Sequence, residues 1–261
     1  MKKQLHITLV QTELAWENPD ANFRYLSQQL KAVRAGQSDL IVLPEMFTTG
    51  FSMEAEQLAE PTEARTYAWM AEKAQALEAV VTGSFIAEVD GHYYNRLLWV
   101  RPDGSYECYD KRHLFTLAGE EHTYTAGNRH LLTDLHGWKV MPLICYDLRF
   151  PVWSRNTVGY DLLLYVANWP SKRRTAWKQL LCARAIENQA YTIGVNRVGE
   201  DGNGYPHAGD SAVFDYAGEP MLQTADVEGA FTVPLHKAPQ DKFREKLRFL
   251  DDRDAFQLSS V

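Results

Sequence analysis

The sequence predicts an α/β fold in which a mixed β-sheet is layered with helices. Three observations predict it: strand-like apolar runs alternate with a helix pattern at the start of the chain, hairpin turns join strands in the middle, and apolar strands flank another helix in the second half. Parallel strands need crossover helices, whereas tight turns can join antiparallel strands, so this order predicts both kinds of pairing.

The first elements are a strand, a helix and a second strand. Residues 5–10 form an apolar, strand-like run. Apolar residues then repeat at helical spacing over 23–33, and Gly36 is a typical residue just past a helix end. Residues 39–43 are the next apolar strand.

Another helix and two hairpins are expected next. A helical pattern over 63–77 leads into an apolar strand over 79–87. An Asp-Gly turn reverses the chain into a strand over 92–101, and a Pro-Asp-Gly turn reverses it again into the alternating stretch 105–110.

Strands and a helix alternate again in the second half of the chain. Residues 161–167 are a strongly apolar strand, a helix pattern surrounds Trp177, and 190–197 are a further strand. A Gly-Asn-Gly turn separates this strand from one at 212–214. The amphipathic stretch 242–250 is expected either to cross to a partner subunit or to lie on the surface as a helix.

Cys145 is the most informative residue, because it directly follows the apolar run 141–144 and precedes a polar turn. A thiol at the end of a strand can meet a substrate, and the next backbone N–H, that of Tyr146, then points at the group that the sulfur attacks. A single cysteine is more often a buried packing residue, so further signals are needed.

Two more polar residues stand at strand ends. Glu45 follows an apolar run and a proline, and Lys111 follows the alternating stretch 105–110. Taken singly, each has an ordinary alternative, a solvated loop acid and a surface lysine. Taken with Cys145, they supply a carboxylate, an ammonium and a thiol.

These three groups suit hydrolysis of an amide through a thioester. A free thiol titrates near ~8.5, so it needs a base or a nearby cation at neutral pH. Glu45 is the candidate base, and Lys111 is the candidate group that stabilises negative charge on the sulfur and on the tetrahedral oxyanion. This chemistry needs no cofactor.

The other cysteines and the histidines do not indicate a metal site or disulfides. Cys108 lies in an alternating strand and Cys182 in a helical pattern, so both are expected to pack. The chain has three cysteines and eight histidines but no C-x-x-C and no H-E-x-x-H. We expect no bound metal.

The motifs around the three groups resemble those of the carbon-nitrogen hydrolase, or nitrilase, superfamily. Within it, Cys-Tyr-Asp-Leu-Arg-Phe-Pro at 145–151 and Asn-Trp-Pro at 168–170 are most similar to the omega-amidase branch. The matching segments are Leu43-Pro44-Glu45, Asp110-Lys111-Arg112-His113-Leu114, Cys145-Tyr146-Asp147-Leu148-Arg149-Phe150-Pro151, Leu181-Cys182-Ala183-Arg184-Ala185-Ile186-Glu187-Asn188-Gln189 and Gly209-Asp210-Ser211.

The resemblance implies a four-layer αββα sandwich, a homodimer, and a Glu-Lys-Cys triad of Glu45, Lys111 and Cys145. It also implies a second glutamate between the lysine and the cysteine. Glu120 and Glu121 are both candidates, and Glu121 fits the family spacing to an aromatic residue and a glycine better.

The resemblance to omega-amidases also implies a substrate, the terminal amide of a short 2-oxo dicarboxylic acid monoamide such as 2-oxoglutaramate or 2-oxosuccinamate. Its far carboxylate needs a cation or several donors when it is buried. Arg149 and Arg173 are the leading candidates beside Lys172, and Phe115 and Trp169 are expected to form the walls.

Composition agrees with an enzyme that acts on a small molecule. The chain has 261 residues, 45% hydrophobic, with no linker, and we expect one domain over 1–261. No apolar signal region or membrane-length run is present, so a cytoplasmic location is expected. The formal charge of −7 disfavours a nucleic-acid or anionic-membrane partner.

Two alternatives remain at this point. The same triad serves aliphatic amidases, N-carbamoyl hydrolases and nitrilases, and the triad residues do not distinguish among them. A sensor protein with a regulatory reactive thiol is the other alternative, although a sensor needs no oxyanion stabiliser.

Overall fold

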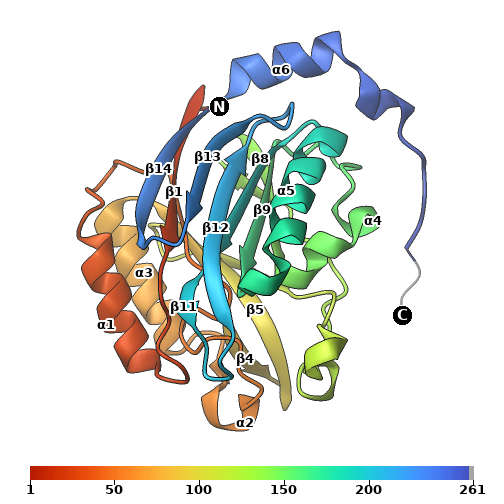
Figure 1. Ribbon diagram of the computed structural model, residues 1–261. Coiled ribbons are helices and arrows are strands. Elements are labelled where there is room, and N and C mark those ends of the chain that lie inside the picture. The colour runs from red at the N-terminus through yellow and green to blue at the C-terminus, as the bar shows by residue number, and fades with distance from the viewer. Residues whose placement is uncertain (259–261) are drawn as a thin grey trace.

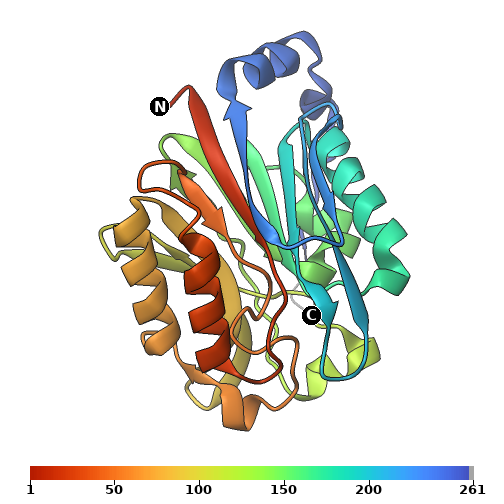
Figure 2. The same ribbon diagram turned by 60° about the vertical axis from the view of Figure 1, so that its left-hand side comes forward.

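The computed structural model describes residues 1–258 as four layers, with two mixed β-sheets packed face to face between helices (Figures 1 and 2). The expected domain 1–261 extends three residues beyond this range. Helices α1 (Pro19–Leu30) and α3 (Arg65–Leu77) cover the outer face of one sheet, and α4 (Pro151–Ser154) and α5 (Arg174–Asn188) cover that of the other. The predicted αββα sandwich is confirmed.

The first sheet is built mainly from the N-terminal half of the chain. Its central pairs, β1 (Gln4–Gln11) with β2 (Leu40–Val42) and β2 with β4 (Val80–Val89), are parallel, and the other pairs between long neighbouring strands are antiparallel. The short strand β3 (Glu60–Pro61) pairs with β4. In spatial order the strands are β14 (Gly229–His236), β1 (Gln4–Gln11), β2 (Leu40–Val42), β4 (Val80–Val89), β5 (His92–Val100) and β6 (Tyr106–Asp110).

The second sheet is built from the C-terminal half. Strands β8 (Trp138–Ile144), β9 (Leu162–Ala167) and β10 (Tyr191–Asn196) run parallel to one another, and β12 (Pro206–Phe214) pairs antiparallel with β10. Strand β13 (Pro220–Ala225) pairs with β12. In spatial order the strands are β11 (Val198–Glu200), β12 (Pro206–Phe214), β10 (Tyr191–Asn196), β9 (Leu162–Ala167), β8 (Trp138–Ile144) and β7 (Thr133–Leu135).

Strand β2 shows why its sequence is apolar at every position. Leu40 and Val42 pack in the core between the sheets, whereas Ile41 and Leu43 pack in the core under α1 and α3. Successive side chains of a strand point to opposite faces of the sheet. A strand covered on both faces therefore has apolar residues throughout and no alternation of apolar and polar residues.

Two helix boundaries differ from the sequence prediction. Helix α1 begins at Pro19, with the Asn18 side chain accepting a hydrogen bond from the Ala21 N–H, and it ends before Val33. The last helix, α6 (Lys237–Lys246), starts earlier than expected and lies beyond the ends of the sheets in Figure 1. Two short elements, α2 (Ala55–Leu58) and the 3₁₀ turn η5 (Phe249–Asp252), complete the regular structure outside the site.

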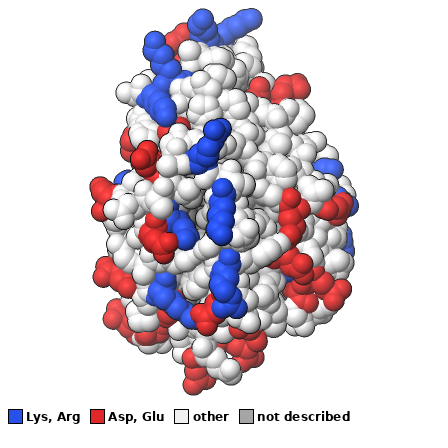
Figure 3. Space-filling view, turned by 90° about the vertical axis from the view of Figure 1, so that its left-hand side faces the viewer, with Lys and Arg blue, Asp and Glu red and all other residues white. Residues whose placement is uncertain are grey.

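The surface mixes charges of both signs. On the face that carries α1 and α3, basic side chains form a column flanked by acidic ones (Figure 3). Within residues 1–258, no helix has both the length and the apolar character needed to cross a membrane.

Candidate active site

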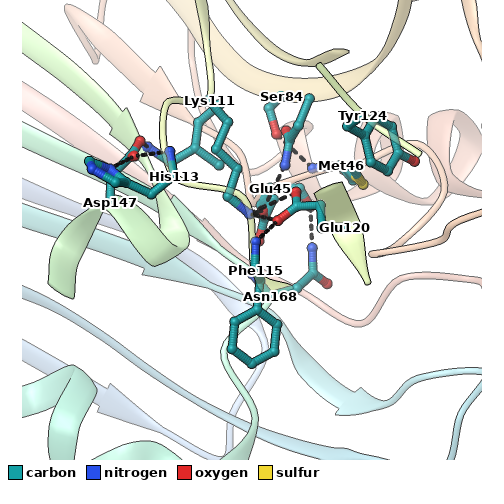
Figure 4. A network of polar contacts seen from close by, with 12 residues as sticks. Glu45, Met46, Ser84, Lys111, His113, Phe115, Glu120, Tyr124, Asp147 and Asn168 are labelled. Atoms are coloured by element: carbon teal, nitrogen blue, oxygen red, sulfur yellow. Dashed lines mark hydrogen bonds and ion pairs between the residues drawn. The ribbon is translucent and has the colours of Figure 1, made fainter. Parts of the chain in front are cut away.

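The three residues predicted to act together lie at three strand ends, and those strands come from both sheets. Glu45 follows β2 and Lys111 follows β6 in the first sheet, while Cys145 follows β8 in the second. Their side chains meet where the two sheets face each other, and Figure 4 shows the polar contacts around Glu45 and Lys111.

Hydrogen bonds from three sides hold the Glu45 carboxylate, which is fully buried. Its Oε1 accepts from Lys111 Nζ at 3.0 Å and from Asn95 Nδ2 at 2.8 Å. Its Oε2 accepts from the backbone N–H of Asn168 at 2.7 Å. A carboxylate fixed in this way is oriented before a substrate arrives.

Lys111 is buried between two carboxylates. Its Nζ lies 3.0 Å from Glu45 Oε1 and 2.9 Å from both oxygens of Glu120, and 5.0 Å from the centre of the Phe51 ring. Burial lowers the pKa of the Lys111 ammonium, but the carboxylates of Glu120 and Glu45 outweigh it and raise the pKa overall. Lys111 is therefore a permanent positive charge.

Glu120, not Glu121, is the glutamate beside the lysine, so the preference for Glu121 was wrong. Glu120 is fully buried and also accepts a hydrogen bond from the Phe115 N–H. Glu121 points toward solvent, with its carboxylate 3.6 Å from His122. Both belong to the 3₁₀ turn η2 (Glu120–His122), which follows η1 (Thr116–Ala118), and only its first residue faces inward.

Cys145 opens a 3₁₀ turn, η3 (Cys145–Arg149), with a left-handed backbone at φ +42°. This conformation is costly for a residue with a side chain and places the cysteine on a sharp corner. Burial, the nearby Glu45 charge and hydrogen bonding to Glu45 raise the pKa of the Cys145 thiol, with Lys111 opposing them. The resting sulfur is therefore a thiol that needs a base.

A cavity of about 780 Å³ opens onto these residues. Glu45, Lys111 and Cys145 line it, and so do all five residues predicted to bind substrate: Phe115, Tyr146, Arg149, Trp169 and Arg173. Neither Glu120 nor Glu121 lines it, which limits Glu120 to acting through Lys111.

Two guanidinium groups on the cavity wall lack an acidic partner in the described part of the chain. Arg149 Cζ lies 4.8 Å from the centre of the Trp169 ring, and Arg173 Cζ lies 5.0 Å from that of Phe115. Within residues 1–258 neither forms a salt bridge. Burial lowers the pKa of Arg173. Arg174, the next residue, instead pairs with Asp210 at 2.8 Å.

Several residues at the site were not predicted. Asn95 and Asn168 hydrogen-bond to the Glu45 carboxylate. Asn168 directly follows β9, just as Cys145 directly follows the neighbouring parallel strand β8, and this shared position at a strand end is the signal that could have identified Asn168.

His207 also lines the cavity without having been predicted, and its Nδ1 lies 2.9 Å from the Tyr205 carbonyl oxygen. Because a carbonyl only accepts, this nitrogen carries the proton. Burial lowers the pKa of His207 to about 4.

The remaining cysteines lie away from the cavity. Cys108 is exposed on β6, so the expectation that it is a packing residue was wrong, whereas Cys182 is partly buried on α5. Among residues 1–258, no group of three or more His, Cys, Asp or Glu side chains is arranged to hold a metal.

Comparisons with known proteins agree with this geometry. Residues 6–233 match the carbon-nitrogen hydrolase family. The chain is 47% identical to the omega-amidase YafV of Escherichia coli K12 over 258 residues, covering 97% of this chain and 98% of that protein. It is 30% identical to the 2-oxoglutaramate amidase of Bacillus subtilis over 94% of this chain and 96% of the other.

The fold is also found in solved structures. The carbon-nitrogen hydrolase superfamily protein XC1258 of Xanthomonas campestris, which carries an arsenic adduct in its active site, has a TM-score of 0.96 and 44% identity, covering 99% of this chain and 100% of the other. Yeast Nit3 has a TM-score of 0.83 at 22% identity, covering 95% of each chain. The chain belongs to the carbon-nitrogen hydrolase family of the nitrilase superfamily.

Proposed function

We propose that this protein is an omega-amidase that hydrolyses the terminal amide of 2-oxoglutaramate or 2-oxosuccinamate to the 2-oxo dicarboxylate and ammonia. One observation carries the proposal: a buried thiol, carboxylate and ammonium share a cavity with two guanidinium groups that lack acidic partners among residues 1–258. The names of the similar proteins from E. coli and B. subtilis support the same substrate class.

In the first half of the reaction, Glu45 accepts the thiol proton as the Cys145 sulfur adds to the amide carbon. Lys111 Nζ and the Tyr146 N–H stabilise the oxyanion. Collapse of the tetrahedral intermediate breaks the C–N bond. The nitrogen leaves as ammonia with the proton that Glu45 held, and the acyl group stays on the sulfur.

In the second half, Glu45 accepts a proton from water as its oxygen adds to the thioester carbon. The second tetrahedral intermediate breaks the C–S bond, the carboxylic acid leaves, and the sulfur recovers a proton from Glu45. Lys111 neutralises the oxyanion in both steps, and Glu120 holds Lys111 in place.

The arginines favour an anionic substrate over the amides of other branches. A substrate carboxylate between Arg149 and Arg173 gives each guanidinium the partner that it lacks, while Phe115 and Trp169 form apolar walls. Glutamine fits less well because its α-ammonium takes the place of the keto oxygen beside these cations. Nitriles and N-carbamoyl amino acids share the triad chemistry, so they are tested directly beside the 2-oxo monoamides.

A panel of compounds tests the substrate class. Ammonia release is measured with 2-oxoglutaramate, 2-oxosuccinamate, succinamate, glutamine, asparagine, a nitrile and an N-carbamoyl amino acid. We expect the first three to be hydrolysed and the others to react poorly. Preference for glutamine or the nitrile would place the protein outside the omega-amidases, and carbon dioxide release would indicate an N-carbamoyl hydrolase.

We also propose that the enzyme acts as a homodimer in the cytoplasm, where thiols stay reduced, with no nucleic-acid or membrane partner. The proposal is supported by apolar side chains exposed on the outer helical layer, Val152 on α4 and Ile186 on α5. Light scattering of the purified protein tests this, since a monomer mass would contradict it.

A further inference from the structure

Asp147 places a fully buried carboxylate between the segment that carries the cysteine and the segment that carries the lysine. Its Oδ2 accepts from the backbone N–H of Ile144 at 3.0 Å and from the Tyr109 hydroxyl at 2.7 Å. Ile144 directly precedes Cys145, so this oxygen stabilises the sharp turn of the backbone at the cysteine.

The other oxygen holds the lysine segment. Asp147 Oδ1 accepts from the His113 N–H at 3.0 Å and from His113 Nδ1 at 2.8 Å (Figure 4). Tyr109 and His113 each lie two residues from Lys111, on its two sides. One carboxylate therefore receives four hydrogen bonds, from both sides of the lysine and from the residue before the cysteine.

We propose that Asp147 is a positioning residue that holds Lys111 and Cys145 at their working separation. It acts through Ile144, Tyr109 and His113, since it does not line the cavity. The inference rests on the proposed function, in which Lys111 must lie beside the oxyanion that forms at the cysteine. A misplacement of ~1 Å in such a site can lower the rate by about 100-fold.

The backbone conformation of Cys145 requires such stabilising contacts. A left-handed backbone is unfavourable for a residue with a side chain and persists only where its surroundings enforce it. The bond from the Ile144 N–H to Asp147 closes the turn over the cysteine. Without an acceptor there, the corner can relax away from Lys111.

The test compares Asp147→Asn with Asp39→Asn. Asparagine keeps the size of Asp147 but turns one oxygen into a donor that faces other donors. Asp39 is a matched control, because it is buried and accepts a backbone N–H, that of His6 at 2.8 Å, but does not line the cavity. We expect kcat of Asp147→Asn to fall about 100-fold with KM within about threefold, and Asp39→Asn to keep near wild-type kcat per folded molecule.

A second measurement does not depend on the substrate. Alkylation of Cys145 by iodoacetamide, followed by mass spectrometry across pH, reports how the thiol is held. In Asp147→Asn the relaxed cysteine should react with a pH midpoint nearer that of a free thiol, ~8.5, while Asp39→Asn should follow the wild type. If wild type hydrolyses no amide, the proposed function fails, but this measurement still tests Asp147.

A milder pair of variants covers the case in which Asp147→Asn does not fold. His113→Asn keeps an N–H donor near Nδ1, whereas His113→Leu removes it, so kcat should fall in His113→Leu and largely recover in His113→Asn. The proposal would be overturned by equal kcat values in these two His113 variants. It would also be overturned if Asp147→Asn lost no more activity than Asp39→Asn and kept the wild-type alkylation profile.

Discussion

Lys111 Nζ lies 2.9 Å from each carboxylate oxygen of Glu120, and both side chains are buried. This symmetric contact orients the ammonium group toward Glu45 and fixes the position of its positive charge. Glu120 also accepts from the Phe115 N–H, so the same carboxylate ties the lysine to a wall of the cavity.

The adjacent glutamates give a matched pair of variants. Glu120→Gln should lower kcat by about 10- to 100-fold, because Lys111 loses an ionic partner and moves from its place beside the oxyanion. Glu121→Gln should change kcat by less than about twofold, since its side chain points to solvent. Steady-state ammonia release measures both, and equal losses in the two variants would contradict the assignment of Glu120.

Cys145 is the predicted nucleophile. Cys145→Ala and Cys145→Ser should abolish turnover while circular dichroism shows an intact fold. Cys108→Ala and Cys182→Ala should keep kcat near wild type, because neither cysteine lines the cavity. An active Cys145→Ala would exclude the thioester route.

Glu45→Gln should separate two effects of Glu45, its role as the base in turnover and its effect on the pKa of the Cys145 thiol. Turnover should fall by orders of magnitude, because the amide cannot accept the thiol proton. The thiol pKa should fall, since the Glu45 charge and its hydrogen bond raise that pKa and Lys111 remains nearby. The pH profile of iodoacetamide alkylation measures this shift, and a midpoint equal to or above the wild type would show that Glu45 does not act on the thiol.

Neighbouring arginines test recognition of the substrate carboxylate. Arg173→Met should lower kcat/KM for 2-oxoglutaramate by at least about 100-fold and far less for an uncharged amide of similar length, because the buried carboxylate loses its partner. Arg149→Met should act in the same direction. Arg174→Met is the control, since Arg174 pairs with Asp210 and does not line the cavity. Equal losses on both amides would make the arginine structural.

His207 predicts a pH dependence of stability. Its pKa is lowered from 6.5 to about 4 in the folded protein by burial, so the unfolded chain binds a proton more readily. The stabilisation is therefore fully present above pH ~6.5 and is lost as pH falls through 4, by a limiting value on the order of 3 kcal/mol. Urea unfolding of His207→Gln at pH 7.5 and pH 5 should show a smaller loss than the wild type, and an equal loss would exclude this role.

Sequence predicted the strand ends that carry Glu45, Lys111 and Cys145, because a polar residue after an apolar run is visible along the chain. It chose the wrong glutamate, because which residue of a single 3₁₀ turn faces inward depends on packing. It also missed β14, since only Val233 and Leu235 of that strand are buried and its partner β1 lies more than 200 residues away. The contacts of Asp147 could not be predicted, because its partners, Tyr109 and His113, lie more than 30 residues earlier in the chain.

The division of the site between the two sheets has a consequence for folding. Glu45 follows a strand of the first sheet and Asn168 a strand of the second, and these two hydrogen-bonded residues are 123 residues apart in the chain. A fragment that contains only one sheet therefore cannot form the complete active site. Contacts of such long sequence separation form slowly, because a large loop must close before they are made. We expect the chain to refold as one unit, with helical signal returning first and hydrolysis reappearing only when the two sheets dock.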